Sequence, residues 1–240
     1  MYLVGGGWAE EDRDDMYGPF LEEAGAGAVV ACLVLDEGDG AGQAERWAAV
    51  LRATAPCEPR VVLVADGGVL DPAALDGADA LLVCGGLTPA YAAALAPVAA
   101  EVRAWCGQRP YLGFSAGAAA AAGQAVVGGW RLDGRAVCPE DAGEDLHELL
   151  VTEGLGLVPF AVDVHAAQWG TLARLVAAVG CGAVGSGVAL DEGTVLHVAD
   201  GTATVRGSGS VHVVRPGADG ITVRSLRADS SVDAAALGQR

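Results

Sequence analysis

The stretch Arg109-Pro-Tyr-Leu-Gly-Phe-Ser-Ala-Gly-Ala-Ala119 decides the fold. Its apolar run Tyr111–Phe114 is typical of a buried strand, and the alanine-rich run Ala116–Ala122 is typical of a helix. The turn between them, Gly113–Gly117, has the pattern G-x-S-x-G in the strand–turn–helix context that this pattern requires. Such a sharp turn exposes the serine hydroxyl and accepts only small residues two positions before and after it. We therefore predict that Ser115 is a nucleophile.

The first half of the chain repeats this alternation of apolar runs and helix-like stretches. The predicted strands are Met1–Val4, Ala28–Leu35, Arg60–Ala65, Ala80–Cys84 and Tyr111–Phe114. The predicted helices are Asp15–Ala24, Ala41–Thr54, Thr88–Gly107 and Ala116–Ala122. This order predicts an α/β fold, with a mostly parallel central sheet flanked by helices.

The second half changes character. The segment Gly123–Glu153 is irregular, Leu157–His165 is typical of a strand, and Gly170–Val179 is typical of a helix. From Gly187 onward the apolar residues follow a period of two, with Asp-Gly and Pro-Gly turns. We therefore expect a C-terminal antiparallel section that closes the sheet.

Composition limits the classes of function. The chain has 240 residues, 52% of them hydrophobic, so we expect one α/β domain over residues 1–228 and a flexible, polar tail over 229–240. Its 14 basic residues are all arginines and face 31 acidic ones, for a net charge of −17, which argues against nucleic acid as a partner. The lack of lysine excludes Schiff-base chemistry and a Walker-type loop, and the lack of asparagine excludes a Cys-His-Asn triad.

The termini and cysteines favour a cytoplasmic protein. The N-terminus lacks the basic start and apolar core of a secretory signal, and no run of about 20 apolar residues predicts a membrane span. None of the six cysteines forms a C-x-x-C pair, so we expect structural thiols in a reducing compartment rather than zinc ligands or disulfides. No membrane partner is expected, and a homodimer is a possible assembly.

A second glycine turn, Gly85-Gly86, ends the strand before Thr88 and belongs to the same sheet edge as Ser115. The N–H groups of Ala116 and Gly86 are our candidate oxyanion donors. A plain strand-to-helix turn capped by Thr88 is the alternative for this segment. The loop Gly5–Gly7 lacks the spacing of a dinucleotide motif, so we interpret it as a tight turn.

Among the four histidines, His165 is the predicted base, because it ends a strand that would reach the edge of Ser115 if parallel to the others. Asp163 lies on the same face of that strand and could orient the local structure. His147 sits in an acidic loop. His197 and His212 alternate with apolar residues, as packed or surface histidines do.

Five segments together resemble peptidase family S51, the dipeptidase E and cyanophycinase-like serine peptidases. They are the opening strand with Gly5–Gly7, the turn Gly85–Thr88, the elbow Gly113–Ala118, the run Gly154–Pro159 that leads to Asp163-Val-His165, and the segment Gly187–Thr194. The resemblance covers most of the chain and implies a class-I glutamine amidotransferase-like, flavodoxin-like sandwich. It also implies hydrolysis of a small peptide or amide without metal or cofactor, with Ser115 as nucleophile and His165 as base.

The chain departs from the family pattern at three places. The family carries an acid between serine and histidine, and the nearest one here is Asp133, which we take as the third catalytic residue, with Glu140 and Asp141 further on. Trp169 and Thr171 stand where the family has arginines after the histidine. Leu87 replaces the asparagine of the usual G-G-N-T turn.

The substrate shell has therefore changed. We predict Thr88, Gln168 and Arg131 as substrate-binding residues, with Arg131 or Arg135 supplying local positive charge in an acidic protein. Aspartyl specificity is an expectation from the family alone.

Two other functions compete with a serine peptidase. The missing arginines and the uncertain acid leave open a non-catalytic binding or regulatory protein on the same scaffold. An α/β-hydrolase esterase would use His212 as base with Asp191 or Asp200, but the chain lacks an HGGG-type oxyanion loop. A class-I glutamine amidotransferase needs cysteine where Ser115 stands.

Overall fold

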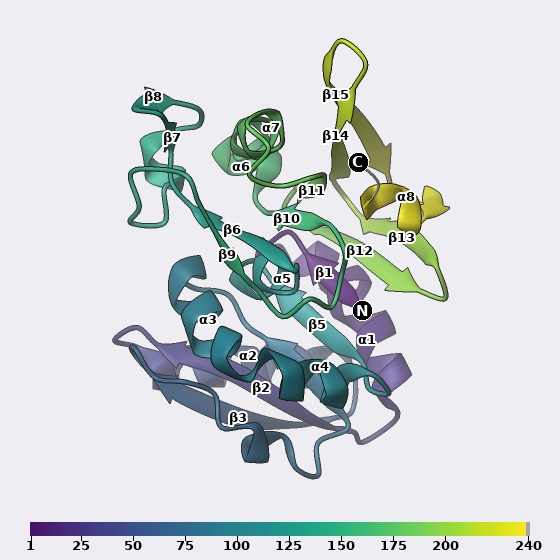
Figure 1. Cartoon of the computed structure of the whole chain (residues 1–240). Coiled ribbons are helices and arrows are strands. Elements are labelled where there is room, and N and C mark those ends of the chain that lie inside the picture. Colours follow the sequence, from purple (N-terminus) through teal and green to yellow (C-terminus); the bar gives the residue numbers. More distant parts are fainter. Residues whose placement is uncertain (239–240) are drawn as a thin grey trace.

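The computed structural model describes residues 1–238 and contains a large central sheet (Figure 1). Its eight strands run in the order β16-β13-β12-β1-β5-β4-β2-β3. The strands are β1 (Tyr2–Val4), β2 (Val29–Asp36), β3 (Glu58–Ala65), β4 (Ala80–Val83), β5 (Tyr111–Phe114), β12 (Thr194–Ala199), β13 (Thr202–Gly207) and β16 (Ser231–Asp233). Strands β1, β5, β4, β2 and β3 are parallel, and β12, β13 and β16 extend the sheet antiparallel. The predicted fold class is confirmed.

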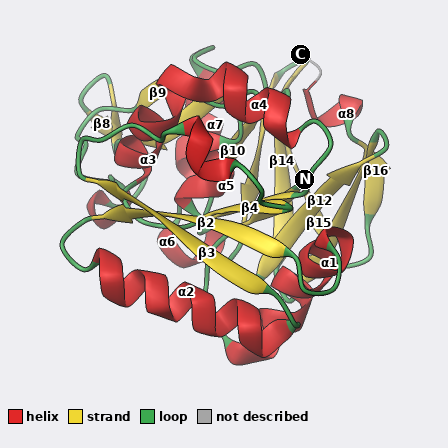
Figure 2. Ribbon diagram, turned by 90° about the horizontal axis from the view of Figure 1, so that it is seen from below, coloured by secondary structure: helices red, strands yellow, loops and turns green. Residues whose placement is uncertain are grey.

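Helices cover both faces of this sheet, which is why β1, β4 and β5 are apolar along their whole length. Helices α1 and α2 lie on one side, and α3, α4 and α5 lie on the other (Figure 2). The helices are α1 (Arg13–Ala24), α2 (Gly40–Thr54), α3 (Thr88–Leu95), α4 (Ala99–Cys106) and α5 (Ala116–Ala120).

The helix predicted over Thr88–Gly107 is divided. A 3-10 turn, Ala96–Val98, separates α3 from α4. Pro97 stands in this turn, and proline lacks the N–H that an uninterrupted helix would use there. Two further 3-10 turns precede α1 and β4, at Glu10–Asp12 and Pro72–Leu75.

A second sheet packs beside the first, in the order β10-β11-β14-β15. Its strands are β10 (Ala161–Asp163), β11 (Gly187–Leu190), β14 (Ser210–Gly217) and β15 (Gly220–Arg227). Helices α6 (Ala166–Trp169) and α7 (Leu172–Gly180) connect β10 to β11. The strand predicted over Leu157–His165 is thus shorter and pairs in parallel with β11 rather than joining the central sheet.

The irregular segment forms two small ribbons. Strand β6 (Gln124–Gly128) pairs with β9 (Leu150–Glu153), and β7 (Arg131–Leu132) pairs with β8 (Arg135–Ala136). A 3-10 turn, Glu140–Ala142, lies between β8 and β9.

The segment predicted to be a flexible tail contains regular structure. Strand β16 pairs with β13, and α8 (Ala235–Gly238) follows it. Leu237 is buried in the main core, and its carbonyl accepts a hydrogen bond from the Ser186 hydroxyl. These apolar and hydrogen-bond contacts order a segment that looks polar in sequence. The last two residues of the predicted tail lie outside the described residues.

The cysteines are all free thiols, and three of them, Cys32, Cys84 and Cys106, are buried. Burial raises the pKa of the Cys32 thiol to about 12, so this group is a neutral core side chain. Among residues 1–238, no helix combines the length and apolar character that a membrane crossing demands.

Candidate active site

Ser115 occupies a strained turn between β5 and α5. Its backbone has φ 50° and ψ −109°, a conformation that residues other than glycine rarely adopt. The flanking glycines are sterically required: a Cβ on Gly113 would lie 2.4 Å from the Gly117 carbonyl oxygen, and one on Gly117 would lie 2.2 Å from that of Val83. The Ser115 N–H donates to the carbonyl of Val4, which ties the elbow to the end of β1.

His165 reaches Ser115 from the second sheet. Its Nε2 lies 2.7 Å from the Ser115 hydroxyl oxygen, and both side chains are buried. The His165 backbone has φ 56° and donates its N–H to the carbonyl of Gly5. The end of β1 therefore holds both residues, although their strands belong to different sheets.

Glu192 completes a continuous chain of hydrogen bonds. Its Oε1 lies 2.7 Å from Nδ1 of His165. A carboxylate at this nitrogen keeps the proton on Nδ1, so Nε2 is free to accept from the Ser115 hydroxyl. Glu192 stands between β11 and β12, at the junction of the two sheets.

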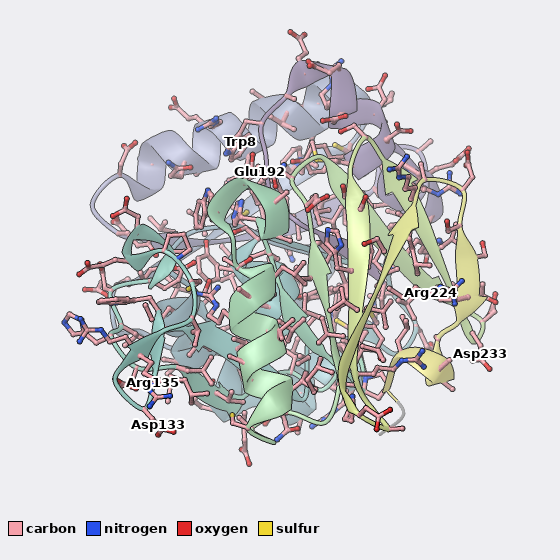
Figure 3. All side chains as sticks on the ribbon, turned by 90° about the horizontal axis from the view of Figure 1, so that it is seen from above. Trp8, Asp133, Arg135, Glu192, Arg224 and Asp233 are labelled. Carbon is pink, nitrogen blue, oxygen red and sulfur yellow. The ribbon has the colours of Figure 1, made fainter. Side chains whose placement is uncertain are left out.

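Asp133, the acid chosen from the sequence, does not meet His165. It stands in the exposed turn between β7 and β8, with φ 52°. Figure 3 shows Asp133 and Arg135 at one edge of the molecule, far from Glu192. The carboxylate beside the histidine is therefore Glu192, because the β7–β8 ribbon projects away from the sheet edge. The choice of Asp133 assumed an acid between serine and histidine, whereas Glu192 follows both.

The loop Gly5–Gly7 is more than a tight turn. A Cβ on Gly6 would lie 2.1 Å from Cε1 of His165, and one on Gly7 would lie 2.9 Å from Cβ of Glu192. The Gly6 carbonyl also accepts the N–H of Gly193. These glycines are needed because the imidazole and the carboxylate pack directly onto the backbone.

The predicted oxyanion donors are free to act. Within residues 1–238, no hydrogen bond uses the N–H of Ala116 or of Gly86. The next amide, that of Leu87, instead donates to Glu37 Oε1 at 2.7 Å. Gly86 lines the same cleft as Ser115, so both donors stay predictions that agree with this geometry.

The three predicted substrate-binding residues have other partners. Thr88 is buried, and its N–H and hydroxyl both donate to the Glu144 carboxylate. Gln168 uses its side-chain oxygen to accept the N–H of Glu192 at 3.0 Å. Arg131 stacks on Trp130, with its guanidinium carbon 3.9 Å from the ring centre. None of the three lines the cleft over Ser115.

This cleft has a volume of about 510 Å³ and brings in residues that the sequence analysis did not single out. Trp8, Glu37 and Arg46 line it together with Ser115 and His165. The Arg46 guanidinium carbon lies 3.6 Å from the centre of the Trp8 ring. Trp8 follows β1, Glu37 follows β2 and Arg46 lies on α2, and no local motif marks them.

The electrostatic surroundings of His165 favour the neutral imidazole. Burial lowers the pKa of His165, whereas the hydrogen bond and charge of Glu192 oppose that fall. Behind the histidine, Arg174 Nη2 and Nε contact the Asp163 carboxylate at 2.7 and 2.9 Å, and both side chains are buried. Asp163 therefore pairs with Arg174, and its oxygens make no hydrogen bond to the His165 ring.

The other histidines lie apart from Ser115. His212 contacts Asp191 Oδ1 through Nε2 at 3.2 Å and the Ser225 hydroxyl through Nδ1 at 2.8 Å. Asp191 also accepts the N–H groups of Ala167 and Ser210. His212 therefore belongs to a structural network, which removes it as the base for Ser115.

The remaining two histidines pack against aromatic rings. His197 stacks on Tyr2, and His147 lies beside Trp130. Among residues 1–238, no group of three or more His, Cys, Asp or Glu is placed to hold a metal ion.

The fold and the site define an α/β sandwich that carries a Ser–His–Glu hydrogen-bond chain at a strand–helix elbow. No protein-family model matches this chain, and no curated protein matches it. A solved structure similar to it is the 1.5 Å crystal structure of a candidate peptidase E from Listeria monocytogenes EGD-e. The two chains are 13% identical, with a TM-score of 0.49, and the match covers 94% of this chain and 97% of the other.

Proposed function

We propose that this chain is a serine hydrolase of the S51 peptidase type, which cleaves a small peptide or amide through an acyl-enzyme on Ser115. The observation that carries the proposal is the unbroken chain from the Ser115 hydroxyl through His165 to Glu192. Both of its links measure 2.7 Å. The strained elbow and the two free N–H groups beside it support the same function.

The reaction follows from these positions. His165 Nε2 takes the Ser115 proton as the serine oxygen attacks the substrate carbonyl, and the N–H groups of Gly86 and Ala116 stabilise the oxyanion. The C–N bond then breaks, and His165 gives its proton to the leaving amine. Water then attacks the acyl-enzyme while His165 Nε2 takes one of its protons. The ester C–O bond breaks, the acid product leaves, and His165 gives that proton to the Ser115 oxygen. Glu192 holds the imidazole in the required tautomer throughout.

The cleft suits a small substrate. Its volume of about 510 Å³ lies in the usual range for small-molecule sites. Among residues 1–238, Arg46 is the only arginine that lines it, and Glu37 and Asp39 lie on the same lining. A short peptide carries one carboxylate and one ammonium group, so charges of both signs fit a free dipeptide.

The first test labels the protein with a fluorophosphonate. In this reaction the Ser115 oxygen forms a bond to phosphorus, the P–F bond breaks, fluoride leaves and His165 takes the hydroxyl proton. We expect labelling of the wild type and complete loss in Ser115→Ala and His165→Ala. Ser225→Ala is the matched control, because Ser225 also contacts a histidine but lies outside the cleft, and it should label normally.

The second test supplies a panel of dipeptides with aspartyl, neutral and basic first residues and measures released amino acids by mass spectrometry. Release that disappears in Ser115→Ala would establish the peptidase and identify its preferred residue. A folded wild type that neither labels nor releases amino acids would refute the hydrolase and favour the non-catalytic binding protein.

A further inference from the structure

The indole of Trp169 lies flat on the imidazole of His165. The two ring centres are 3.8 Å apart, and the planes differ by 8°. Trp169 also lines the cleft over Ser115 and remains 41% exposed. One face of the catalytic imidazole is therefore covered by an aromatic ring rather than by water. The catalytic cycle proposed above does not account for this contact.

The short helix α6 holds this ring in place. The Trp169 N–H donates to the His165 carbonyl, and Gly170 ends the helix at once with φ 73°. Two of the three residues between His165 and Trp169 also make hydrogen bonds: the Ala167 N–H donates to Asp191, and the Gln168 side chain accepts from Glu192. Because Ala167, Gln168 and Trp169 each make a hydrogen bond to a residue of the site or of its supporting network, the stack is part of the site's framework.

Three charged groups act on His165. Glu192 contacts Nδ1 from the loop before β12, and the Asp163–Arg174 pair lies behind it on β10 and α7. Asp163 and Arg174 act on the imidazole with opposite signs. The neutral indole covers one face of the imidazole.

An aromatic face distinguishes the two states of the histidine. Its π-electrons attract a cation above the ring, whereas they attract a neutral imidazole much less. In the proposed reaction His165 becomes an imidazolium as Ser115 loses its proton. An indole held 3.8 Å away therefore stabilises the state that forms as the serine attacks.

We propose that Trp169 is a positioning residue that orients the His165 ring and stabilises its imidazolium form. This inference rests on the proposed hydrolase function. Trp169 acts through His165 and so affects the rate of acylation more than the binding of substrate.

The deciding experiment is an NMR titration of the four histidine Cε1–H groups, with His165→Gln used to assign the His165 signal. It compares wild type with Trp169→Phe and Trp169→Leu. We expect the pKa of His165 to fall by about half a pH unit to one unit in Trp169→Leu, because leucine keeps an apolar cover without a π face. Phenylalanine should restore part of this difference. Trp105→Leu is the matched control on α4, and it should leave the His165 midpoint unchanged.

The sign of the shift separates the two roles of the ring. If Trp169 only shields the histidine from water, its removal admits water and raises the pKa of His165. A rise, or no change, in Trp169→Leu would overturn the proposal. A fall that is accompanied by a several-fold lower kcat, with KM little changed, would support it.

The titration needs no substrate, so the two proposals fail separately. If the wild type neither labels nor turns over but the pKa of His165 falls in Trp169→Leu, the stack stabilises the cation and the hydrolase function is refuted. If turnover is present and the midpoint does not fall, the hydrolase stands and the role of Trp169 is refuted.

Discussion

Oε1 of Glu192 lies 2.7 Å from Nδ1 of His165, and the two residues belong to loops that follow different strands of the second sheet. His165 follows β10, whereas Glu192 follows β11 and leads directly into β12 of the central sheet. The pair β10–β11 is parallel, so both loops emerge at the same edge. This shared edge, rather than proximity in sequence, brings the acid to the histidine.

Glu192→Gln should lower the fluorophosphonate labelling rate and kcat by about 100-fold or more. The neutral amide cannot stabilise the imidazolium, and it permits the wrong tautomer. Asp133→Asn is the matched control and should leave both rates unchanged, because Asp133 lies in an exposed turn. A large loss of labelling rate and kcat in Asp133→Asn alone would instead show that Asp133, the residue predicted from the sequence, is the catalytic acid.

The labelling rate should rise with pH and reach half its maximum below pH 6.5, the ordinary pKa of histidine. Burial lowers the pKa of His165, and only the neutral imidazole can accept the serine proton. Glu192 opposes this fall, so Glu192→Gln should move the midpoint further down. Stopped-flow labelling between pH 4 and pH 8 measures both midpoints, and a wild-type midpoint above 6.5 contradicts this expectation.

Gly6→Ala should abolish labelling. Its Cβ would lie 2.1 Å from Cε1 of His165, so the imidazole must move away from Ser115. Gly25→Ala is matched in backbone strain, since Gly25 has φ +98° against +104° for Gly6, but its Cβ would meet no atom within 4 Å. Both variants should lose about 1–3 kcal/mol of stability in thermal unfolding, whereas Gly25→Ala should keep its activity. Normal labelling of folded Gly6→Ala would show that the loop does not position the histidine.

Gln168→Ala tests whether Gln168 binds substrate or supports Glu192. Its oxygen accepts the Glu192 N–H, and such a bond contributes about 1 kcal/mol, so we expect kcat to fall about five-fold with little change in KM. Steady-state kinetics on the best dipeptide separate the two constants. A rise in KM at constant kcat would instead restore the substrate-binding role predicted from the sequence.

Arg174→Met should destabilise the fold by about 3–5 kcal/mol, because it leaves the buried Asp163 carboxylate without its partner. The double variant Asp163→Leu/Arg174→Met should lose less, since it removes both charges together. Urea unfolding gives the two free energies. If the single variant proves as stable as the wild type, the ion pair does not hold β10 against α7.

Several features could be predicted from sequence because short-range sterics decide them. The sharp strand-to-helix turn at Ser115 has room only for glycine on either side of the serine, so the G-x-S-x-G pattern predicts it. The apolar runs before each glycine turn predict parallel strands with open ends at one edge. His165 could be predicted at this edge for the same reason, because it ends an apolar run. The prediction of one helix over Thr88–Gly107 was wrong for a local reason. It did not take into account that Pro97 lacks the N–H that a continuous helix needs at that position.

What the sequence alone determined is therefore the elbow, its histidine and the layered α/β architecture, each of which depends on residues that are neighbours in the chain. The tertiary structure alone decided the rest: Glu192 as the carboxylate beside His165, Trp169 over the imidazole, and Arg46 with Trp8 in the cleft. The loop Gly5–Gly7 follows β1 of the central sheet and packs directly against His165, Asp191 and Glu192, which follow strands of the second sheet. No local pattern encodes that approach, because it depends on how the two sheets pack against each other.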